Sequence, residues 1–160
     1  MIDRSLEKAS RNIKAHHLES NVTIQKMDYH HLDGFKGSTF DGAYTMETLI
    51  HATDPEAAIR EFFRVLKPGG TIAFYEYDHT NLNSAPLKLK DAIKKINKYA
   101  SMPSNARFDN GVHQRMLEEA GYEDVVVRDL SENVMPTIRL LCWLMCRTCL
   151  SGCSDWKLGS

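Results

Sequence analysis

The stretch FDGAYTMETLIHATDPEAAIREFFRVLKPGGTIAFYEYDH, residues 40–79, contains the pattern that decides the fold. Residues 40–44 are a short, largely apolar run that is typical of a buried parallel strand. Apolar side chains then recur at helical spacing from Ile59 to Leu66, which predicts an amphipathic helix. Residues 71–75 predict a second strand. A strand, a helix and a strand in this order indicate a right-handed parallel unit of an α/β fold.

Capping and breaking residues mark the ends of this helix. Thr53 or Asp54 can cap its N-terminus, and a capping box would pair Thr53 with Glu56. Pro55 suits the first turn, where its missing N–H needs no partner. Residues 67–70, Lys-Pro-Gly-Gly, predict the stop, because proline cannot continue a helix and glycine accepts a left-handed cap.

A ligand site is expected beyond the carboxyl ends of the two strands, where parallel sheets bind their ligands. The segments there are residues 46–51 and 75–79. The run FFRVLKPGG, followed by an apolar strand and Tyr-Glu, resembles the class I S-adenosylmethionine-dependent methyltransferases. Residues 47–52, ETLIHA, and residues 74–77, FYEY, look most like the sterol C-methyltransferase branch.

The resemblance covers roughly residues 1–140 and implies a Rossmann-like sheet with helices on both faces. The first strand of that sheet and its glycine-rich loop have no counterpart, since the chain contains no Gly-x-Gly. An N-terminally truncated methyltransferase is therefore expected, with residues 141–160 as a cysteine-containing tail. Its open sheet centre would favour a homodimer or pairing with a full-length relative. The alternative to an enzyme is a non-catalytic interaction module that pairs in this way.

S-adenosyl-L-methionine is the cofactor that the resemblance implies. Asp3 matches the acidic residue that accepts hydrogen bonds from the ribose hydroxyls at the end of the second strand, and residues 1–3 resemble that strand end. Asp28 matches the acidic residue that meets the adenine amino group, which makes its neighbour Tyr29 a further candidate. Met46 lies where the family's backbone touches the cofactor. Without the resemblance, Asp3 is more simply a solvated or capping residue, Asp28 a turn residue and Met46 a packing residue.

Two mechanisms are open for methyl transfer to a small-molecule or lipid-like acceptor. An alkene acceptor gives a carbocation that the faces of Tyr75 and Tyr77 can stabilise and that Glu47 or Glu76 can deprotonate. A hydroxyl acceptor would use His51 as the general base. Strand alternation puts Tyr75 and Tyr77 on one side and Glu76 on the other, so core packing and a structural carboxylate are the alternatives for Tyr75 and Glu76.

The remaining pattern predicts further helices and strands. A helix capped by Ser5 is expected to end near residues 17–20, and further helices are expected at residues 89–96 and from residues 109–110 to Gly121. Alternation predicts a half-exposed edge strand at residues 21–27. The valines of residues 125–127 predict the start of another strand.

The four cysteines fall at one helical spacing near the C-terminus: Cys142, Cys146, Cys149 and Cys153. The first three also have the spacing of the radical-type iron–sulfur motif, but small buried apolar residues on one helix face explain them more simply. The histidine pairs at residues 16–17 and 30–31 lack further spaced ligands. No metal is therefore expected.

The composition limits the classes of function that the chain can be expected to have. The 160 residues carry 20 Lys and Arg against 21 Asp and Glu, which gives no reason to expect nucleic-acid binding. No signal peptide or spanning helix is recognised, so a cytoplasmic protein is expected. The lysine-rich face of residues 89–96 is most simply solvated, and docking on anionic lipid is the alternative. Residues 140–145 could likewise rest on a membrane surface.

Overall fold

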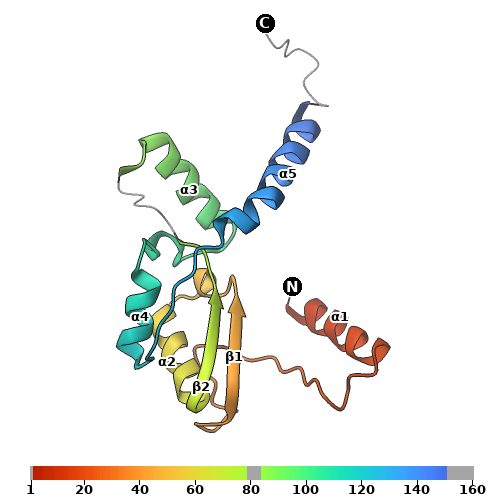
Figure 1. Ribbon diagram of the computed structural model, residues 1–160. Helices are drawn as coiled ribbons and strands as arrows, with labels where there is room; N and C mark the ends of the chain where they lie inside the picture. Colours follow the sequence, from red (N-terminus) through yellow and green to blue (C-terminus); the bar gives the residue numbers. More distant parts are fainter. Residues whose placement is uncertain (1, 79–83, 151–160) are drawn as a thin grey trace, which may run out of the picture. The chain divides into compact units, whose positions relative to one another are not determined.

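The computed structural model of the protein describes residues 2–78 and 84–150 (Figure 1). The chain divides into two compact units, Met1–Val125 and Val126–Ser160. The first contains two strands and most of the helices, and the second contains one long helix. The elements of the first unit are α1 (Ile2–Ala15), β1 (Phe40–Met46), the 3-10 turn η1 (Leu49–His51), α2 (Pro55–Val65), β2 (Leu66–Tyr75), α3 (Leu87–Tyr99), the 3-10 turn η3 (Asn105–Arg107) and α4 (Val112–Ala120).

The two strands form a parallel sheet, which confirms the predicted strand, helix and strand unit (Figure 1). Their pairing runs from Phe40 opposite Leu66 to Met46 opposite Tyr75, with a shift in register after the first pair. The Lys-Pro-Gly-Gly segment lies in that irregularity inside β2. The prediction that this segment ends the helix and precedes the strand was therefore wrong. The helix already ends at Val65, and the strand begins at Leu66, before the segment.

Backbone crowding at the irregularity explains one of its glycines. A Cβ on Gly70 would lie 2.9 Å from the carbonyl oxygen of Lys67 and 3.0 Å from that of Asp41. The Lys67 ammonium also binds the Asp41 carboxylate at 2.6 Å, across the two strands. Only glycine allows the backbones to approach this closely.

The core lies on one face of the sheet, between the strands, α2 and α4 (Figure 1). Strand alternation directs the side chains of Ile72 and Phe74 to that face. The buried cluster comprises Leu49, Ile50, Ala58, Ile59, Phe62, Phe108 and Met116. Because η1 contributes two of these residues, the loop after β1 is anchored directly in the core.

Capping of α2 differs from the predicted box. The Asp54 carboxylate accepts a hydrogen bond from the backbone N–H of Ala57 at 2.8 Å, so Asp54 is the N-cap. Glu56 forms an ion pair with Arg107 from η3 and does not reach back to Thr53. The prediction of a Thr53 capping box was wrong because this cation competes for the Glu56 carboxylate.

The loop before β1 is tied to α2 by a charged pair. Arg64 donates to the carbonyl oxygens of Phe35 and Leu32, each at 3.0 Å, and to Glu61 at 2.7 Å. Glu61 in turn accepts from the backbone N–H of Leu32 at 2.8 Å. These bonds lower the pKa of the Glu61 carboxyl to about 2, the Arg64 hydrogen bonds being the largest cause.

Three predicted strand segments are not strands. Residues 22–27 and 125–127 are irregular, and Asp3 lies in the first turn of α1. A strand needs a neighbour for its backbone hydrogen bonds, and among the described residues β1 and β2 pair only with each other. In α1, Ile2 extends the helical spacing of Leu6, so the helix begins before Ser5.

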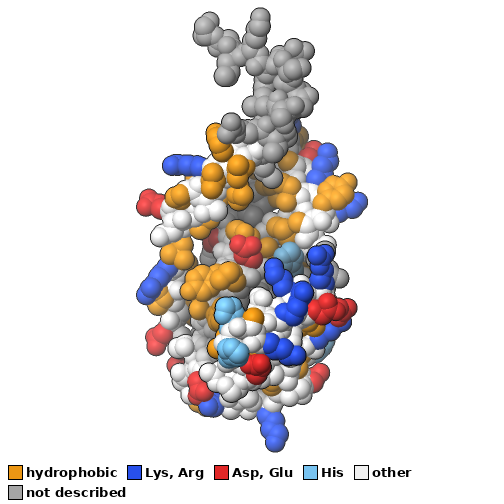
Figure 2. Space-filling model, turned by 90° about the vertical axis from the view of Figure 1, so that its right-hand side faces the viewer, with side chains coloured by type: hydrophobic (Ala, Val, Ile, Leu, Met, Phe, Trp, Pro, Cys, Tyr) orange, Lys and Arg blue, Asp and Glu red, His pale blue; other side chains and the backbone are white. Residues whose placement is uncertain are grey.

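The second face of the sheet carries no covering layer among the described residues. Tyr44 is 74% exposed, Met46 64% and Tyr75 48%. The expected helices on both faces are therefore seen on one face only. Figure 2 shows hydrophobic side chains lying open on the side of the molecule that it faces.

The helices predicted at residues 89–96 and before Gly121 are present as α3 and α4. Gly121 ends α4 with a φ of +103°, as expected of a left-handed cap. Gly111, and not Asp109 or Asn110, precedes its first turn. The second unit contains α5 (Ser131–Leu150), whose first turn begins where Asp129 accepts a hydrogen bond from the N–H of Ser131 at 2.8 Å.

Candidate functional site

Glu76 organises the loop that follows β1. Its Oε1 accepts hydrogen bonds from the backbone N–H groups of Thr48 at 2.7 Å and Leu49 at 3.0 Å. The hydroxyl of Thr45 contributes a longer bond at 3.4 Å. The carboxylate thereby caps η1, where two unpaired N–H groups favour a negative charge. Glu76 Oε1 therefore holds the loop after β1, whereas Oε2 is buried without a hydrogen-bond partner among the described residues.

Glu47 and Tyr77 meet at the carboxyl ends of the two strands. The backbone N–H of Glu47 donates to the carbonyl oxygen of Tyr75 at 2.8 Å, which extends the ladder by one residue. Glu47 has a φ of +50°, a left-handed conformation that is uncommon for a residue with a side chain. Its carboxylate accepts a hydrogen bond from the Tyr77 hydroxyl, and this bond is the main reason that the Tyr77 pKa rises to about 12.

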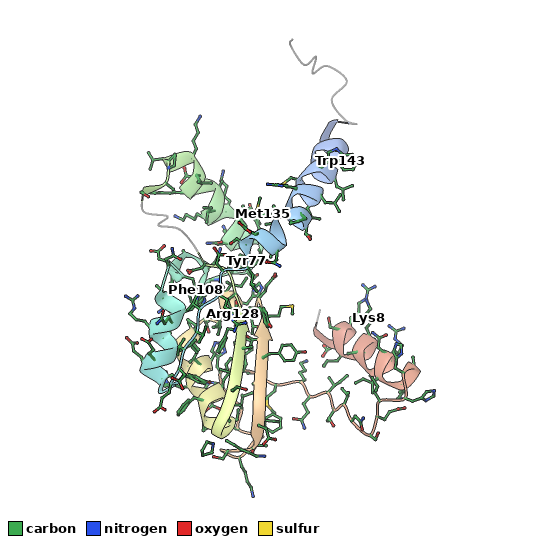
Figure 3. All side chains as sticks on the ribbon, in the orientation of Figure 1. Lys8, Tyr77, Phe108, Arg128, Met135 and Trp143 are labelled. Carbon is green, nitrogen blue, oxygen red and sulfur yellow. The ribbon has the colours of Figure 1, made fainter. Side chains whose placement is uncertain are left out.

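Two tyrosines, Tyr75 and the Tyr77 of this pair, are exposed on the uncovered side of the sheet. Tyr75 and Tyr77 are 48% and 44% exposed, and they lie on the side opposite to the inward Glu76, as alternation predicts. Figure 3 shows Tyr77 beyond the end of the β2 arrow. Met46 ends β1 opposite Tyr75 and is exposed as well. The arrangement offers two aromatic rings, a thioether and a carboxylate to a bound molecule.

The turn that contains Asp28 lies near the same loops. Asp28 Oδ1 accepts from the backbone N–H of His30 at 2.9 Å and from Nδ1 of its ring at 2.7 Å, and these bonds lower the pKa of the Asp28 carboxyl. The ring uses its other nitrogen, Nε2, to accept from the backbone N–H of Asp54 at 3.4 Å. His30 therefore connects Asp28 to the N-cap of α2.

Tyr29 lies between this turn and the core. Its ring centroid is 4.7 Å from that of His30 and 6.4 Å from that of Phe62. Burial raises the pKa of the Tyr29 hydroxyl, with smaller contributions from the negative charges of Asp28 and Glu76. The Tyr29 hydroxyl is thus close enough to Asp28 and to Glu76 for each charge to act on it.

The two other candidates lie apart from these contacts. The His51 ring donates from Nδ1 to the carbonyl oxygen of Ser101 at 2.8 Å, while its side chain remains exposed. Asp3 binds the ammonium of Lys26 at 2.7 Å from the first turn of α1. No recorded contact within the described part of the chain joins Asp3 to Asp28.

Sequence reasoning missed His30 and the backbone N–H groups of Thr48 and Leu49. The spacing Asp28-x-His30 is a signal for the first, since an aspartate commonly accepts bonds from the residue two positions on. No side-chain pattern reveals the other two, because any residue supplies a backbone N–H. They become visible only when Glu76 is placed beside η1.

The described residues also bear on metal binding and on the presence of a membrane-spanning helix. Within residues 3–78 and 84–144, no three His, Cys, Asp or Glu side chains gather as metal ligands. Cys142 is exposed, contrary to the expectation of a buried residue. The side chains of Cys146 and Cys149, and the whole of Cys153, lie outside the described residues. No described helix is both long and apolar enough to cross a membrane.

Comparison with known proteins gives consistent matches. A family model described as a methyltransferase domain matches residues 1–74. The S-adenosyl-L-methionine-dependent Diels-Alderase iccD of Talaromyces variabilis is 38% identical, over 88% of this chain and 49% of that protein. The Diels-Alderase iliD of Neonectria sp. is 35% identical, over 78% of this chain and 48% of that protein. The sterol 24-C-methyltransferase ERG6 of Saccharomyces cerevisiae is 31% identical, over 82% of this chain and 34% of that protein.

A solved structure matches the fold. The crystal structure of the [4+2]-cyclase SpnF has a TM-score of 0.60 and 25% identity, over 78% of this chain and 40% of that chain. The chain spans about half the length of the first relatives that it matches. These matches agree with the parallel unit of β1, α2 and β2 and with the loops at its carboxyl ends. Over the part of these proteins that it covers, the chain is therefore similar in sequence and fold to class I S-adenosylmethionine-dependent methyltransferases.

Proposed function

We propose that the protein is an S-adenosyl-L-methionine-dependent methyltransferase that acts on a small, largely apolar acceptor of the lipid or sterol kind. The observation that carries the proposal is the Glu47 and Tyr77 pair beyond the carboxyl ends of the strands. It combines a carboxylate with an exposed aromatic face, and Tyr75 adds a second. These are the groups that methylation of an alkene requires.

The residues around Asp28 fit the adenosine part of the cofactor. The Asp28 carboxylate uses Oδ1 for both bonds from His30 and is 62% exposed, so Oδ2 can accept a hydrogen bond from an amino group. Tyr29 offers a partly buried ring beside it. Met46 is exposed at the end of β1 and supplies apolar contact. Asp3 stays a candidate for the ribose by resemblance alone.

S-adenosylmethionine supplies an electrophilic methyl group when it is bound. Methylation of an alkene carbon would leave a positive charge on the neighbouring carbon of the acceptor. The faces of Tyr75 and Tyr77 stabilise this cation, and Glu47 accepts the proton that is lost from the adjacent carbon. The hydrogen bond from Tyr77 orients the Glu47 carboxylate.

Glu76 and His51 have other roles in this scheme. Oε1 of Glu76 is occupied by the N–H groups of Thr48 and Leu49, so we assign Glu76 to positioning the loop that carries Glu47. The His51 ring keeps Nε2 available, and it would serve as the general base only if the acceptor were a hydroxyl.

Transfer of a labelled methyl group to a sterol with a side-chain alkene tests the proposal. Glu47→Gln should lower transfer by about 10²- to 10⁴-fold, which is what general base catalysis typically contributes. Glu7→Gln on α1, which removes an exposed carboxylate elsewhere, serves as the matched control and should leave transfer unchanged. Equal transfer by wild type and Glu47→Gln would remove Glu47 as the base.

A second candidate is a [4+2] cyclisation with the cofactor bound and not consumed. The names of two relatives, iccD and iliD, and the SpnF structure favour it. The bonding of Glu76, Glu47 and His51 is also compatible with it, because a cycloaddition moves no proton and needs no free base. Cyclisation of a triene that continues in S-adenosylhomocysteine, with no label transferred, would favour this reaction. A folded protein that supports neither reaction would favour a non-catalytic module that pairs through its open sheet.

A further inference from the structure

Helix α3 carries its apolar residues on one uncovered face. No residue of the helix is buried. Leu89, Ala92, Ile96 and Tyr99 recur at intervals of three and four, so they share one side. Leu89 is 49% exposed, Ile96 57% and Tyr99 84%. A helix that packed this stripe into its own domain would bury these residues.

The helix is held to the domain by a different side. The amide of Asn97 accepts a hydrogen bond from Asn105 of η3 at 2.7 Å, and its carbonyl oxygen accepts from the N–H of Met102 at 2.8 Å. Ile93 and Asn97 line a cavity of about 610 Å³ between α3 and residues 101–106. Ile93 lies one turn after Leu89, at the edge of the stripe, while Ala92, Ile96 and Tyr99 lie further round the helix and stay exposed.

Positive charge flanks the stripe. The helix has five lysines and one acidic residue, Asp91, over its 13 positions. Lys88 and Lys95 lie beside the stripe on the helix surface, and both are exposed. Lysines also line the cavity on the other side of the helix. An apolar stripe beside a lysine-rich face is the pattern of a helix that lies in a lipid interface.

We propose that α3 docks the protein on an anionic lipid surface. Leu89, Ile96 and Tyr99 enter the boundary between headgroups and acyl chains, and Lys88 and Lys95 meet the phosphates. Charge complementarity favours an anionic lipid surface over a neutral apolar partner, because such a partner would gain nothing from the lysines and would bury them. The docking does not depend on which reaction the protein catalyses.

Flotation of the full chain with vesicles tests the proposal. Binding is expected to phosphatidylcholine vesicles with about 30 mol% phosphatidylserine and to fall when salt is raised to about 0.5 M. Lys88→Gln with Lys95→Gln should weaken binding about 25-fold, because each lysine near such a surface contributes about a factor of five. The charge-retaining pair Lys88→Arg with Lys95→Arg should restore it.

Two further variants make the test specific. Lys8→Gln with Lys14→Gln removes the same charge from α1, and this pair should leave binding within about twofold of wild type. Ile96→Ser should weaken binding while circular dichroism stays unchanged, since the side chain supports no internal packing.

Three results would overturn the proposal. These are no binding to anionic vesicles, equal losses in the α1 and α3 lysine pairs, and equal binding to vesicles of phosphatidylcholine alone. A wild-type dimer that Ile96→Asp converts to a monomer would instead assign the stripe to a second copy of the chain.

Discussion

The Tyr77 hydroxyl donates a hydrogen bond to the Glu47 carboxylate, which joins the first residue after β1 to the second residue after β2. The bond links the two loops that parallel sheets use for binding. Glu47 also has a left-handed backbone, with a φ of +50°, which is uncommon for a residue with a side chain. The Tyr77 pKa reports directly on this contact.

Replacement of Glu47 by Gln should lower the Tyr77 pKa from about 12 toward its ordinary value of 10.0, because the charged acceptor is lost. Ultraviolet titration of tyrosinate measures the change, and subtraction of the Tyr77→Phe spectrum isolates the residue. In wild type the contact stabilises the fold fully below pH 10, and this contribution is lost as the pH rises from about 10 to about 12. A Tyr77 that titrates normally in wild type would show that the bond is absent in solution.

His30→Phe should raise the Asp28 pKa part of the way to its ordinary value. The variant removes the ring hydrogen bond but keeps the backbone N–H of residue 30, which is the larger cause of the lowering. The aromatic contact with Tyr29 is retained. NMR titration of the aspartate carboxyl carbons measures the shift, and an unchanged Asp28 pKa would show that the ring does not bind the carboxylate.

The Glu61 and Arg64 pair should make stability depend on acid. The Glu61 pKa is lowered to about 2, so its contribution is present above pH 4.5 and is lost as the pH falls toward 2. Glu61→Gln should cost about 1 to 2 kcal/mol in urea unfolding at neutral pH, a modest value because Arg64 is 37% exposed. Glu118→Gln on α4 is the exposed control. Equal midpoints for both variants would contradict a role for the pair in holding residues 32–35.

Gly121 and Gly69 form a matched test of backbone conformation. Both have positive φ, +103° and +77°, so alanine should cost each about 1 to 2 kcal/mol. A Cβ at Gly121 would also lie 3.1 Å from the Phe63 ring, whereas a Cβ at Gly69 would meet nothing within 4 Å. Gly121→Ala should therefore be the more destabilising variant in thermal unfolding. The reverse order would show that Phe63 moves aside.

The sequence predicts the local elements of the fold well. The strand that begins at Phe40, residues 71–75 of β2, the helix between the two strands and the helix that ends at Gly121 follow from spacing, proline and glycine. Residues 22–27 show why strand prediction fails: alternation describes which side chains are buried, but a strand exists only where another strand pairs with it. That information is not local.

The candidate site shows a similar limit. Alternation places Tyr75 and Tyr77 on one side and Glu76 on the other, and the structure agrees and shows that the two tyrosines are the exposed ones. Only three-dimensional placement shows that Glu76 binds the N–H groups of Thr48 and Leu49, because backbone donors have no sequence signature. The family resemblance identifies Asp28 as a candidate, and the structure adds His30, which binds it.

Calorimetric titration with S-adenosylhomocysteine tests the central claim most directly, since the claim is that Asp28 and the loops after β1 and β2 hold part of a cofactor site. The account predicts saturable binding by the wild-type chain, about tenfold weaker in Asp28→Asn because a charged hydrogen bond is lost. It also predicts unchanged binding in Asp124→Asn, which replaces an exposed aspartate elsewhere. The absence of saturable heat from a folded sample, or equal binding by Asp28→Asn, would contradict the account.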